Sequence, residues 1–393
     1  MAKSAYERRG ESICAGHERS RLVGGVPLVV EPSSPFVGML KHLPDSSSWA
    51  HSSQIFDSGA DDVSVGWLEP WSIPLSVSHG SATATTFVAS PKSALFLYGI
   101  EEIDLIPNSA SRLLIRMALR LGSELAGILK FDKFVFIHNS LLTTNLLENI
   151  SFTDTLGAVR RINHELPGHY IGIRSISRSI NSSVHDTLAE GGFRMIAARS
   201  IYICKDPLEQ LRRRRDHIRD SALIEKHHLR FREPVSDADF QIIAKLYRSL
   251  YIDKHSGLNP HYSAHYFQCA VKSRFLSIRL VLCGDDIIIG FIAFHQTTKA
   301  LSIPAMGYDP NGSQPFVYRA LINLAFRVAA HNGLMLHLSA GAASFKRSRG
   351  ATQEIEWMAV YVENLHVVKR LFIEVLSYLS TRIAAPLMVR FRI

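Results

Sequence analysis

The sequence predicts a mixed α/β protein made of two similar halves, with mixed β-sheets flanked by helices. The chain has 393 residues, which suits two folded domains at roughly 100–200 residues each. Hydrophobic residues make up 47% of the chain and charged residues 20%, as expected for a globular protein with proper cores. From residue 83 onward, segments with strand-like and helix-like periodicity alternate, which predicts mixed α/β layers.

The same order of elements occurs twice along the chain, with little identity between the two copies. Each copy consists of a strand, a helix, a strand, a short helix and a strand. This repeat predicts two tandem domains of one fold. We expect the elements of the first copy at 134–137, 156–165, 170–176, 182–192 and 193–203, and those of the second copy at 301–308, 314–331, 334–339, 342–350 and 354–362.

The start of the chain lacks this regular pattern. Prolines and serines interrupt it, which predicts irregular structure, while Trp49, Trp67 and Trp71 indicate that it packs on the body. The expected domain organisation is an irregular N-terminal extension at 1–82, a degenerate first domain at 83–206, a charged linker helix at 207–227 and a catalytic second domain at 228–393. Other expected elements are strands at 83–89 and 94–98, a helix at 110–129, a helix from Ser236 with Asp239 at the capping-box position, and an amphipathic tail helix at 365–383.

Charge and composition limit the function classes. The first residues do not resemble a signal peptide, and no apolar run approaches the length of a membrane-spanning helix. The predicted location is therefore cytoplasmic, with no membrane partner. The four cysteines are scattered, which predicts neither a metal site nor a redox dithiol. A net charge of +9 favours polyanionic partners or serves solubility alone. The run 212–215 could bind nucleic acid, but a charged linker is the favoured interpretation.

One segment carries a resemblance to a known family. Residues 336–351 combine an expected strand, a small-residue turn, the step Phe345-Lys346-Arg347 and then Gly350-Ala351 before the last long strand. This pattern and the element order resemble the GNAT superfamily, and within it the tandem FemAB/FemX-like and related acyltransferases. The resemblance covers roughly residues 83–383. It implies two GNAT-like domains and the transfer of an acyl or aminoacyl group to an amine.

The sequence departs from the acetyl-CoA-dependent members of that family. Their fourth strand leads into a glycine-rich loop whose backbone N–H groups hold a pyrophosphate. Here residues 308–315 hold one glycine and two prolines, and Asp309 would repel phosphate; residues 139–154 of the first half offer nothing better. No tightly bound cofactor is expected. The donor stays open between an acyl-CoA, an acyl carrier protein and an aminoacyl-tRNA, and the acceptor is a small-molecule or peptide amine.

The basic step supplies the first candidate site residues. By the resemblance, Lys346 would stabilise the oxyanion formed when the amine attacks the donor carbonyl, or would grip a donor phosphate. Arg347 would bind substrate beside it. The alternative is a solvated basic helix face.

Other candidates lie on a loop and at the ends of two strands. A polar cluster is formed by Lys254, His255, Asn259 and Tyr262. It is either an ordinary loop or a substrate-facing one, in which His255 or Tyr262 could move a proton. His337 and Ser339 lie two apart on the expected fifth strand and share a face, where His337 is either a general base or a core histidine. Asp309 is an alternative base at the end of the fourth strand, and Tyr308 beside it is expected to contact substrate.

Two function classes therefore remain at this point. The first is an N-acyltransferase whose working site lies in the second domain. The second is a non-catalytic binding protein of the same fold, with a nucleic-acid-binding regulator as a further alternative. The oligomeric state is not predicted.

Overall fold

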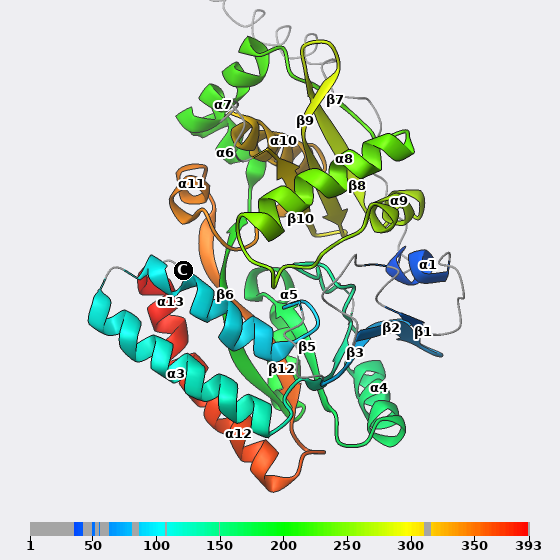
Figure 1. Cartoon of the computed structure of the whole chain (residues 1–393), viewed down its shortest axis with the longest axis vertical. Coiled ribbons are helices and arrows are strands. Elements are labelled where there is room, and N and C mark those ends of the chain that lie inside the picture. Colours follow the sequence, from blue (N-terminus) through cyan, green and yellow to red (C-terminus); the bar gives the residue numbers. More distant parts are fainter. Residues whose placement is uncertain are drawn as a thin grey trace, which may run out of the picture.

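The computed structural model describes residues 35–41, 49–51, 55, 63–80, 86–106, 108–148, 150–309 and 316–391. A sheet of twelve strands runs through the whole molecule (Figure 1). The strands are β1 (Trp49–His51), β2 (Val63–Leu68), β3 (Ile73–His79), β4 (Lys133–Ile137), β5 (Tyr170–Ile176), β6 (Phe193–Cys204), β7 (Arg230–Arg232), β8 (Ser277–Cys283), β9 (Ile287–Gln296), β10 (Ala300–Tyr308), β11 (Met335–His337) and β12 (Thr352–Tyr361).

The strand order shows the repeat directly. It runs β1-β2-β3-β4-β5-β12-β6-β11-β10-β9-β8-β7. Each strand of the first half has a counterpart in the second half, from β1 and β7 to β6 and β12. When every strand is replaced by its counterpart, the sheet order reads the same backwards. The parallel pairs match as well, since β4 pairs with β5 and β10 with β11. The predicted fold class, a mixed α/β sheet flanked by helices, is confirmed.

The two halves exchange their last strands. β12 lies between β5 and β6 and pairs antiparallel with both, while β6 also pairs with β11. The pairing of β6 with β12 is the longest in the sheet and runs from Phe193↔Tyr361 to Ile203↔Thr352. We call the four strands β5, β12, β6 and β11 the seam. The sheet is continuous across the predicted domain boundaries at 82/83, 206/207 and 227/228.

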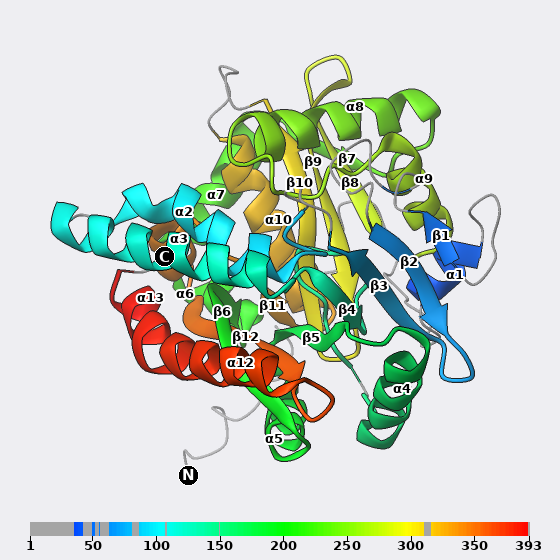
Figure 2. The same cartoon turned by 60° about the horizontal axis from the view of Figure 1, so that its bottom comes forward.

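Helices cover both faces of the sheet (Figures 1 and 2). In the first half, α4 and α5 pack on one face, while α3 and α12 share a core cluster on the other. In the second half, α8 and α10 cover opposite faces. The helices are α1 (Pro35–Lys41), α2 (Tyr98–Glu102), α3 (Ser109–Ile128), α4 (Phe152–Glu165), α5 (Arg178–Glu190), α6 (Pro207–Arg213), α7 (Arg215–Lys226), α8 (Asp237–Tyr247), α9 (Ala264–Lys272), α10 (Val317–His331), α11 (Ala343–Ser348), α12 (Val367–Leu379) and α13 (Ala385–Phe391), with π-helical turns η2 (Ser93–Leu97), η4 (Arg248–Asp253) and η5 (Ser380–Ala384) and a 3-10 turn η3 (Ile103–Leu105).

The prediction of irregular structure in the N-terminal extension is wrong for residues 63–80. Two strands form there because apolar residues alternate on each side of the turn at Pro70, so that Val65 and Leu75 face the core. Of the prolines that suggested irregularity, Pro70 lies in the turn, Pro74 on β3 and Pro35 at the start of α1. The expectation that the extension packs on the body is met by these strands, since β3 pairs with β4. Residues 1–34 of the extension lie outside the described residues.

The expected strand at 94–98 is also wrong, because this run is helical. Phe96 packs over Gly122 of α3, where no side chain is in its way, and joins the core cluster with Ala126. Tertiary packing therefore overrides the strand preference of the run Ala94–Tyr98. Of the other strand expected here, residues 86–89 form a turn and the rest lie outside the described residues.

Several expected elements are confirmed, some with different bounds. The capping box of α8 is present: the Ser236 side chain accepts from the backbone N–H of Asp239, whose carboxylate accepts from that of Ser236. The linker is two helices, not one, because the backbone is extended at Arg214. The tail helix continues as α12, η5 and α13, and Val367–Phe391 is long and apolar enough to cross a membrane by length and composition alone, contrary to expectation. That is weak evidence for a span.

Gly172 at the centre of β5 provides a test of the packing in the seam. A Cβ at this position would meet the carbonyl oxygen of Ala359 on β12 and would lie 2.8 Å from Cζ of the buried Phe134. We expect Gly172→Ala to lower the free energy of unfolding by about 1–3 kcal/mol, the usual cost of overpacking a core. Gly257→Ala is the matched control, since nothing lies within 4 Å of its Cβ. Urea unfolding of both variants measures the effect, and equal midpoints would contradict this packing.

Candidate functional site

The parallel pair β10–β11 separates after three residues. The register covers only Ala300↔Met335, Leu301↔Leu336 and Ser302↔His337, after which β10 continues to Tyr308 without β11 beside it. The chain leaves β11 through a tight turn with positive φ at Ser339, Gly341 and Ala342. The edge of β10 that β11 leaves is buried, and the first half uses part of it, because the Thr143 hydroxyl donates to the carbonyl of Pro304. The two parallel strands therefore part beyond Ser302 and His337.

Lys346 on α11 is buried against this turn. Its Nζ donates to the carbonyl oxygens of Leu338 (2.7 Å), Ser339 (3.3 Å) and Ala340 (2.6 Å). Burial, with a smaller effect of Arg199, lowers the pKa of Lys346 to about 7, while the three carbonyls favour the ammonium form. The geometry shows Lys346 fixing the turn after β11. Its role as an oxyanion stabiliser stays a prediction.

His337 is fully buried beside Lys346. Its Nδ1 accepts from the backbone N–H of Ser339 at 3.1 Å, and its Nε2 lies 3.9 Å from Oε2 of Glu356. Burial lowers its pKa to about 4, so the ring is neutral at pH 7. Because Nδ1 accepts, the proton lies on Nε2. This arrangement suits a donor toward Glu356, and the assignment of His337 as a general base stays a prediction.

The seam holds a buried ion-pair network that the sequence did not reveal. Arg199 on β6 donates to both carboxylate oxygens of Glu356 on β12, from Nε at 2.8 Å and from Nη2 at 3.1 Å. Nη2 also donates to the Thr143 carbonyl and the Thr144 hydroxyl. Burial alone would raise the pKa of Glu356, but the charge and hydrogen bonds of Arg199 outweigh it and lower the pKa. The network therefore connects β6 and β12 to the loop of the first half that holds Thr143 and Thr144.

A second arginine fills the loop after β4. This loop is the counterpart, in the first half, of the chain segment that follows β10. The strand exchange relates β4 to β10, so the loop after β4 occupies the equivalent place. Arg174 lies inside that loop and donates to the carbonyls of Leu142 (2.6 Å) and Thr143 (3.1 Å), while Asn139 donates from its amide to Ser76 and the Val88 carbonyl. The first half therefore fills this loop with its own side chains.

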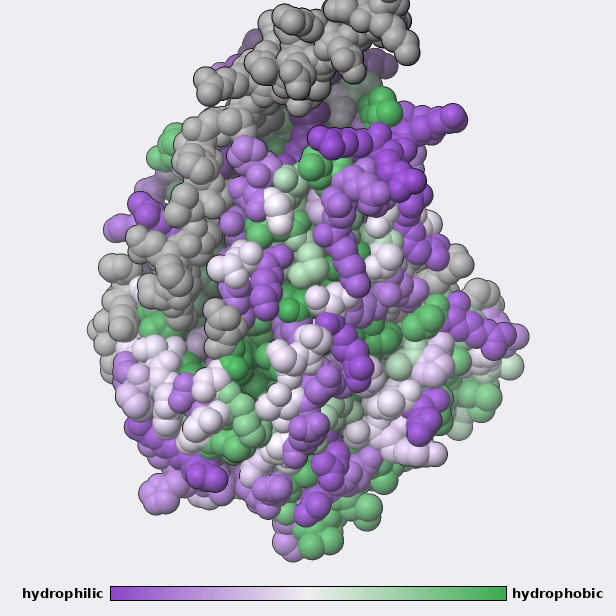
Figure 3. Space-filling view, turned by 180° about the vertical axis from the view of Figure 1, so that it is seen from behind, coloured by the Kyte–Doolittle hydropathy of each residue, from purple (hydrophilic) through white to green (hydrophobic). Residues whose placement is uncertain are grey.

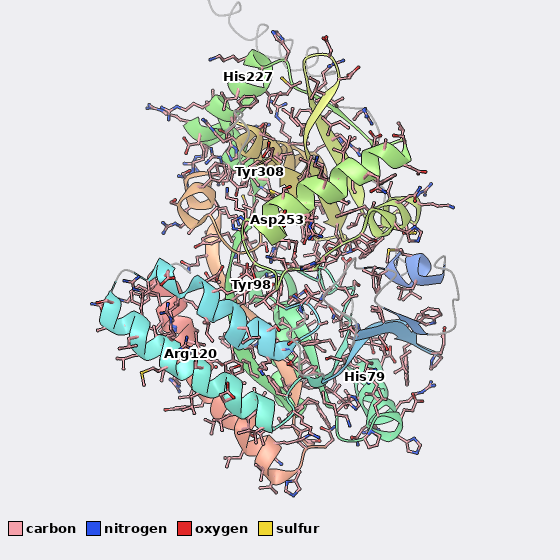
Figure 4. All side chains as sticks on the ribbon, viewed as in Figure 1. His79, Tyr98, Arg120, His227, Asp253 and Tyr308 are labelled. Atoms are coloured by element: carbon pink, nitrogen blue, oxygen red, sulfur yellow. The ribbon has the colours of Figure 1, made fainter. Side chains whose placement is uncertain are left out.

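Four tyrosines converge near the end of β10, and we call them the tyrosine cluster: Tyr98 on α2, Tyr251 on η4, Tyr308 on β10 and Tyr318 on α10. Burial raises the pKa of Tyr251, and the other three members raise it further. The rings of Tyr308 and Tyr318 lie 6.1 Å apart. Figure 4 shows Tyr98 and Tyr308 on opposite sides of the boundary between the halves. With pKa values raised by burial, for Tyr98 to about 12, the hydroxyls stay protonated and can donate.

Glu102 lies one helical turn after Tyr98 and is half-buried. Burial raises its pKa, the nearby Arg199 only partly offsets this, and Glu101 adds to the increase. A carboxyl group with a raised pKa beside a cation and several hydroxyl donors is typical of a catalytic acid or base. Sequence reasoning missed it, because Glu101-Glu102 looks like an ordinary acidic helix end.

The remaining predicted site residues divide into exposed and buried groups. Lys254, His255 and Asp309 are exposed, and the His255 ring lies 6.3 Å from that of Tyr251. Burial, with Lys254, lowers the pKa of His255.

Asn259 and Tyr262 are the buried members of the predicted polar cluster, and they hold the loop after η4 in place. The Asn259 amide donates to the carbonyls of Tyr251 and Ser256, and the Tyr262 hydroxyl donates to that of Leu141 at 2.6 Å. Asn259 also hydrogen-bonds to Tyr98. Arg347 is half-buried on α11, and its Nε has no hydrogen-bond partner among the described residues. Of the predicted substrate-binding residues, Tyr308 lies within the tyrosine cluster and Asn259 contacts it.

Within the described part of the chain, no group of three or more His, Cys, Asp or Glu side chains could hold a metal ion. Comparison with protein-family models gives no match, and neither does comparison with curated proteins.

Solved structures do resemble the chain, all at low identity. A conserved protein of unknown function from Bacteroides thetaiotaomicron is 10% identical over 84% of this chain and 90% of that one, with a TM-score of 0.46. FemX is 10% identical over 54% and 76%, with a TM-score of 0.44. The C-terminal domain of a protein named as a lysylphosphatidylglycerol synthetase, from Agrobacterium fabrum, is 14% identical over 58% and 79%, with a TM-score of 0.42.

The Arg199–Glu356 pair gives a test of the seam. Glu356→Gln removes the buried carboxylate that pairs with Arg199 and that lies near the buried Arg174, so we expect the free energy of unfolding to fall by about 3–5 kcal/mol. Glu165→Gln is the matched control, since its pair with Arg161 is 43–44% exposed and should contribute less than about 1 kcal/mol. Denaturant unfolding at pH 7 measures both.

The stability difference between the wild type and Glu356→Gln should depend on pH. The pKa of Glu356 is lower in the folded than in the unfolded state, so its stabilisation is fully present above the unfolded value and is lost as the pH falls toward the folded one. We expect the difference between wild type and Glu356→Gln to shrink below about pH 4.3, the ordinary value for glutamate. A difference that grew on acidification would contradict this assignment.

Proposed function

We propose that this chain is an N-acyltransferase that moves an acyl or aminoacyl group from an activated carrier to an amine where its two halves meet. The observation that carries the proposal is the parting of β10 from β11 beside the tyrosine cluster and Glu102. The parted strand provides unpaired backbone groups, the tyrosines provide neutral O–H donors, and Glu102 provides a base. Together these are the parts that acyl transfer to an amine requires.

In the proposed reaction, the amine nitrogen attacks the donor carbonyl and a C–N bond forms. Negative charge on the carbonyl oxygen is stabilised by backbone N–H groups on the free edge of β10 and by tyrosine hydroxyls. Glu102 takes the proton that the amine loses. The C–S or C–O bond to the carrier then breaks, and the carrier leaves with a proton as its thiol or hydroxyl.

The donor is proposed to bind on the second-half side of the cluster. Arg347 is proposed to bind a phosphate of the carrier through its guanidinium group, since its side chain is only half-buried on α11. The first half is proposed to be non-catalytic, since Arg174 fills the equivalent loop. Carriers that fit this chemistry are an acyl-CoA, an acyl carrier protein or an aminoacyl-tRNA. Lys346 is proposed as a positioning residue that holds the turn after β11, in place of the direct role expected from the sequence.

Carrier binding can be tested by thermal unfolding. The full chain is mixed in turn with acyl-CoA, acyl carrier protein and charged tRNA, each with its unacylated form as the control. A carrier present at 100 times its Kd should stabilise the protein by about 2.7 kcal/mol. We expect one acylated carrier to raise the melting temperature. If none did, the transferase proposal would fail and the chain would be better described as a binding protein of another ligand.

The base is tested by Glu102→Gln with Glu101→Gln as the matched control. Glu101 is exposed and adjacent in the sequence, so its loss should leave turnover within about twofold. Loss of the Glu102 base should lower kcat by about 10²–10⁴-fold. The acidic limb of the wild-type kcat/KM profile should lie above pH 4.3, because the pKa of Glu102 is raised. Equal activity of the two variants would remove Glu102 from the mechanism.

A further inference from the structure

Helix α3 has an apolar stripe that faces away from the protein. Its buried residues are Ser123 and Ala126. On the opposite side, six large apolar side chains are 43–75% exposed. At about 100° per residue these six cover an arc of about 120°. They are Leu113, Leu114, Met117, Leu121, Leu125 and Ile128. The helix expected at 110–129 therefore presents its apolar residues to the surface.

The C-terminal helix has the same unusual arrangement. In α12, Ile373 is buried in the core, while Val367, Val368, Leu371, Val375, Tyr378 and Leu379 are 44–74% exposed. The exposed residues again lie opposite the buried one. Only 17% of the apolar window in Val367–Phe391 is buried. Helices that cover a soluble core normally have a single apolar stripe.

The two stripes belong to one region of the surface, which we call the apolar face. Both helices pack on the same core cluster, in which Phe131 contacts Phe372. Both views of the ribbon place α3 alongside α12 and α13 at one edge of the molecule (Figures 1 and 2). In the space-filling view from behind, apolar side chains reach the surface at the lower right and bottom (Figure 3). Apolar patches of this extent on a monomer mark an interaction site.

The charges around the apolar face have one predominant sign. Residues 109–130 and 367–391 contain eight lysines and arginines against two glutamates. Glu374 is paired with Arg194 and Arg370, and Arg112 and Arg116 are paired with Asp104, which leaves the other basic residues in excess. Arg120, Arg382 and Arg390 are exposed beside the stripes. An apolar helix face with basic flanks matches the chemistry of a lipid surface with anionic headgroups.

We propose that α3, α12 and α13 dock this protein onto an anionic lipid surface, with their apolar stripes entering the headgroup region and their basic residues contacting the headgroups. The helices lie in the plane of the surface and do not cross it, because Ile373, Ser380 and Ala385 hold α12, η5 and α13 against the body. A second copy of the chain fits less well, because apposed faces would bring two sets of arginines together. This proposal does not depend on the proposed transferase activity.

The test uses the full chain and vesicles. One set is phosphatidylcholine alone and the other contains about one third phosphatidylglycerol, which gives an anionic surface. We expect co-sedimentation with the anionic vesicles and at least tenfold weaker binding to the neutral ones. High salt should weaken the binding without abolishing it, because the apolar contribution is not screened.

Matched variants locate the binding surface. Leu121→Gln with Leu371→Gln replaces one exposed leucine on each helix, at 64% and 61% exposure, and should weaken vesicle binding at least tenfold. Val235→Gln with Ile287→Gln makes the same kind of change at positions that are 82% and 64% exposed elsewhere, and should have no effect. Arg120→Gln with Arg382→Gln should reduce the preference for anionic vesicles. All three variants should keep the wild-type melting temperature within a few degrees.

Three results would overturn the proposal. The first is no binding of the wild type to anionic vesicles. The second is binding that the leucine variant does not weaken. The third is a lipid-free dimer, seen by sedimentation velocity, that the leucine variant converts to monomers, because the apolar face would then join two copies of this chain.

Discussion

The antiparallel pairing of β6 with β12 is the interaction on which the rest of the structure depends. Each half contributes one of the two strands, and each strand also pairs with the other half, so the seam cannot open without breaking the sheet on both sides. Every residue of β5 is buried, while β6 and β12 alternate between buried and half-buried residues along much of their length. The ends of β10 and β11, the tyrosine cluster and α2 all take their positions from this central pair.

Buried charge is concentrated at the same place. Arg199 and Glu356 lie on the two exchanged strands, and His337 approaches from β11. Charges in such surroundings persist only when they are paired and hydrogen-bonded. The consequence for the candidate site is electrostatic: Arg199 contributes to the pKa values of Tyr98, Glu102 and Lys346. A structural ion pair and the proposed catalytic site therefore share one guanidinium group.

The order of elements and the repeat were predictable from local pattern, because strand and helix periodicities are properties of short segments. The capping box at Ser236 and Asp239 is predictable for the same reason. The strand exchange was not, since β12 and β6 meet across more than 150 positions. Among the site residues, Lys346 stood out by its motif, but its carbonyl partners depend on the turn. Glu102 carries no motif, because its raised pKa comes from burial by segments far away in the sequence.

The position of β12 has a consequence for biosynthesis. The first six strands leave the ribosome long before Thr352–Tyr361, which must lie between β5 and β6. At roughly 5–20 residues per second, the edges of these two strands wait on the order of ten seconds for their shared neighbour. Unpaired strand edges are sites of aggregation. A chain truncated before β12 would keep both of these edges unpaired, because β12 is the strand that joins β5 to β6.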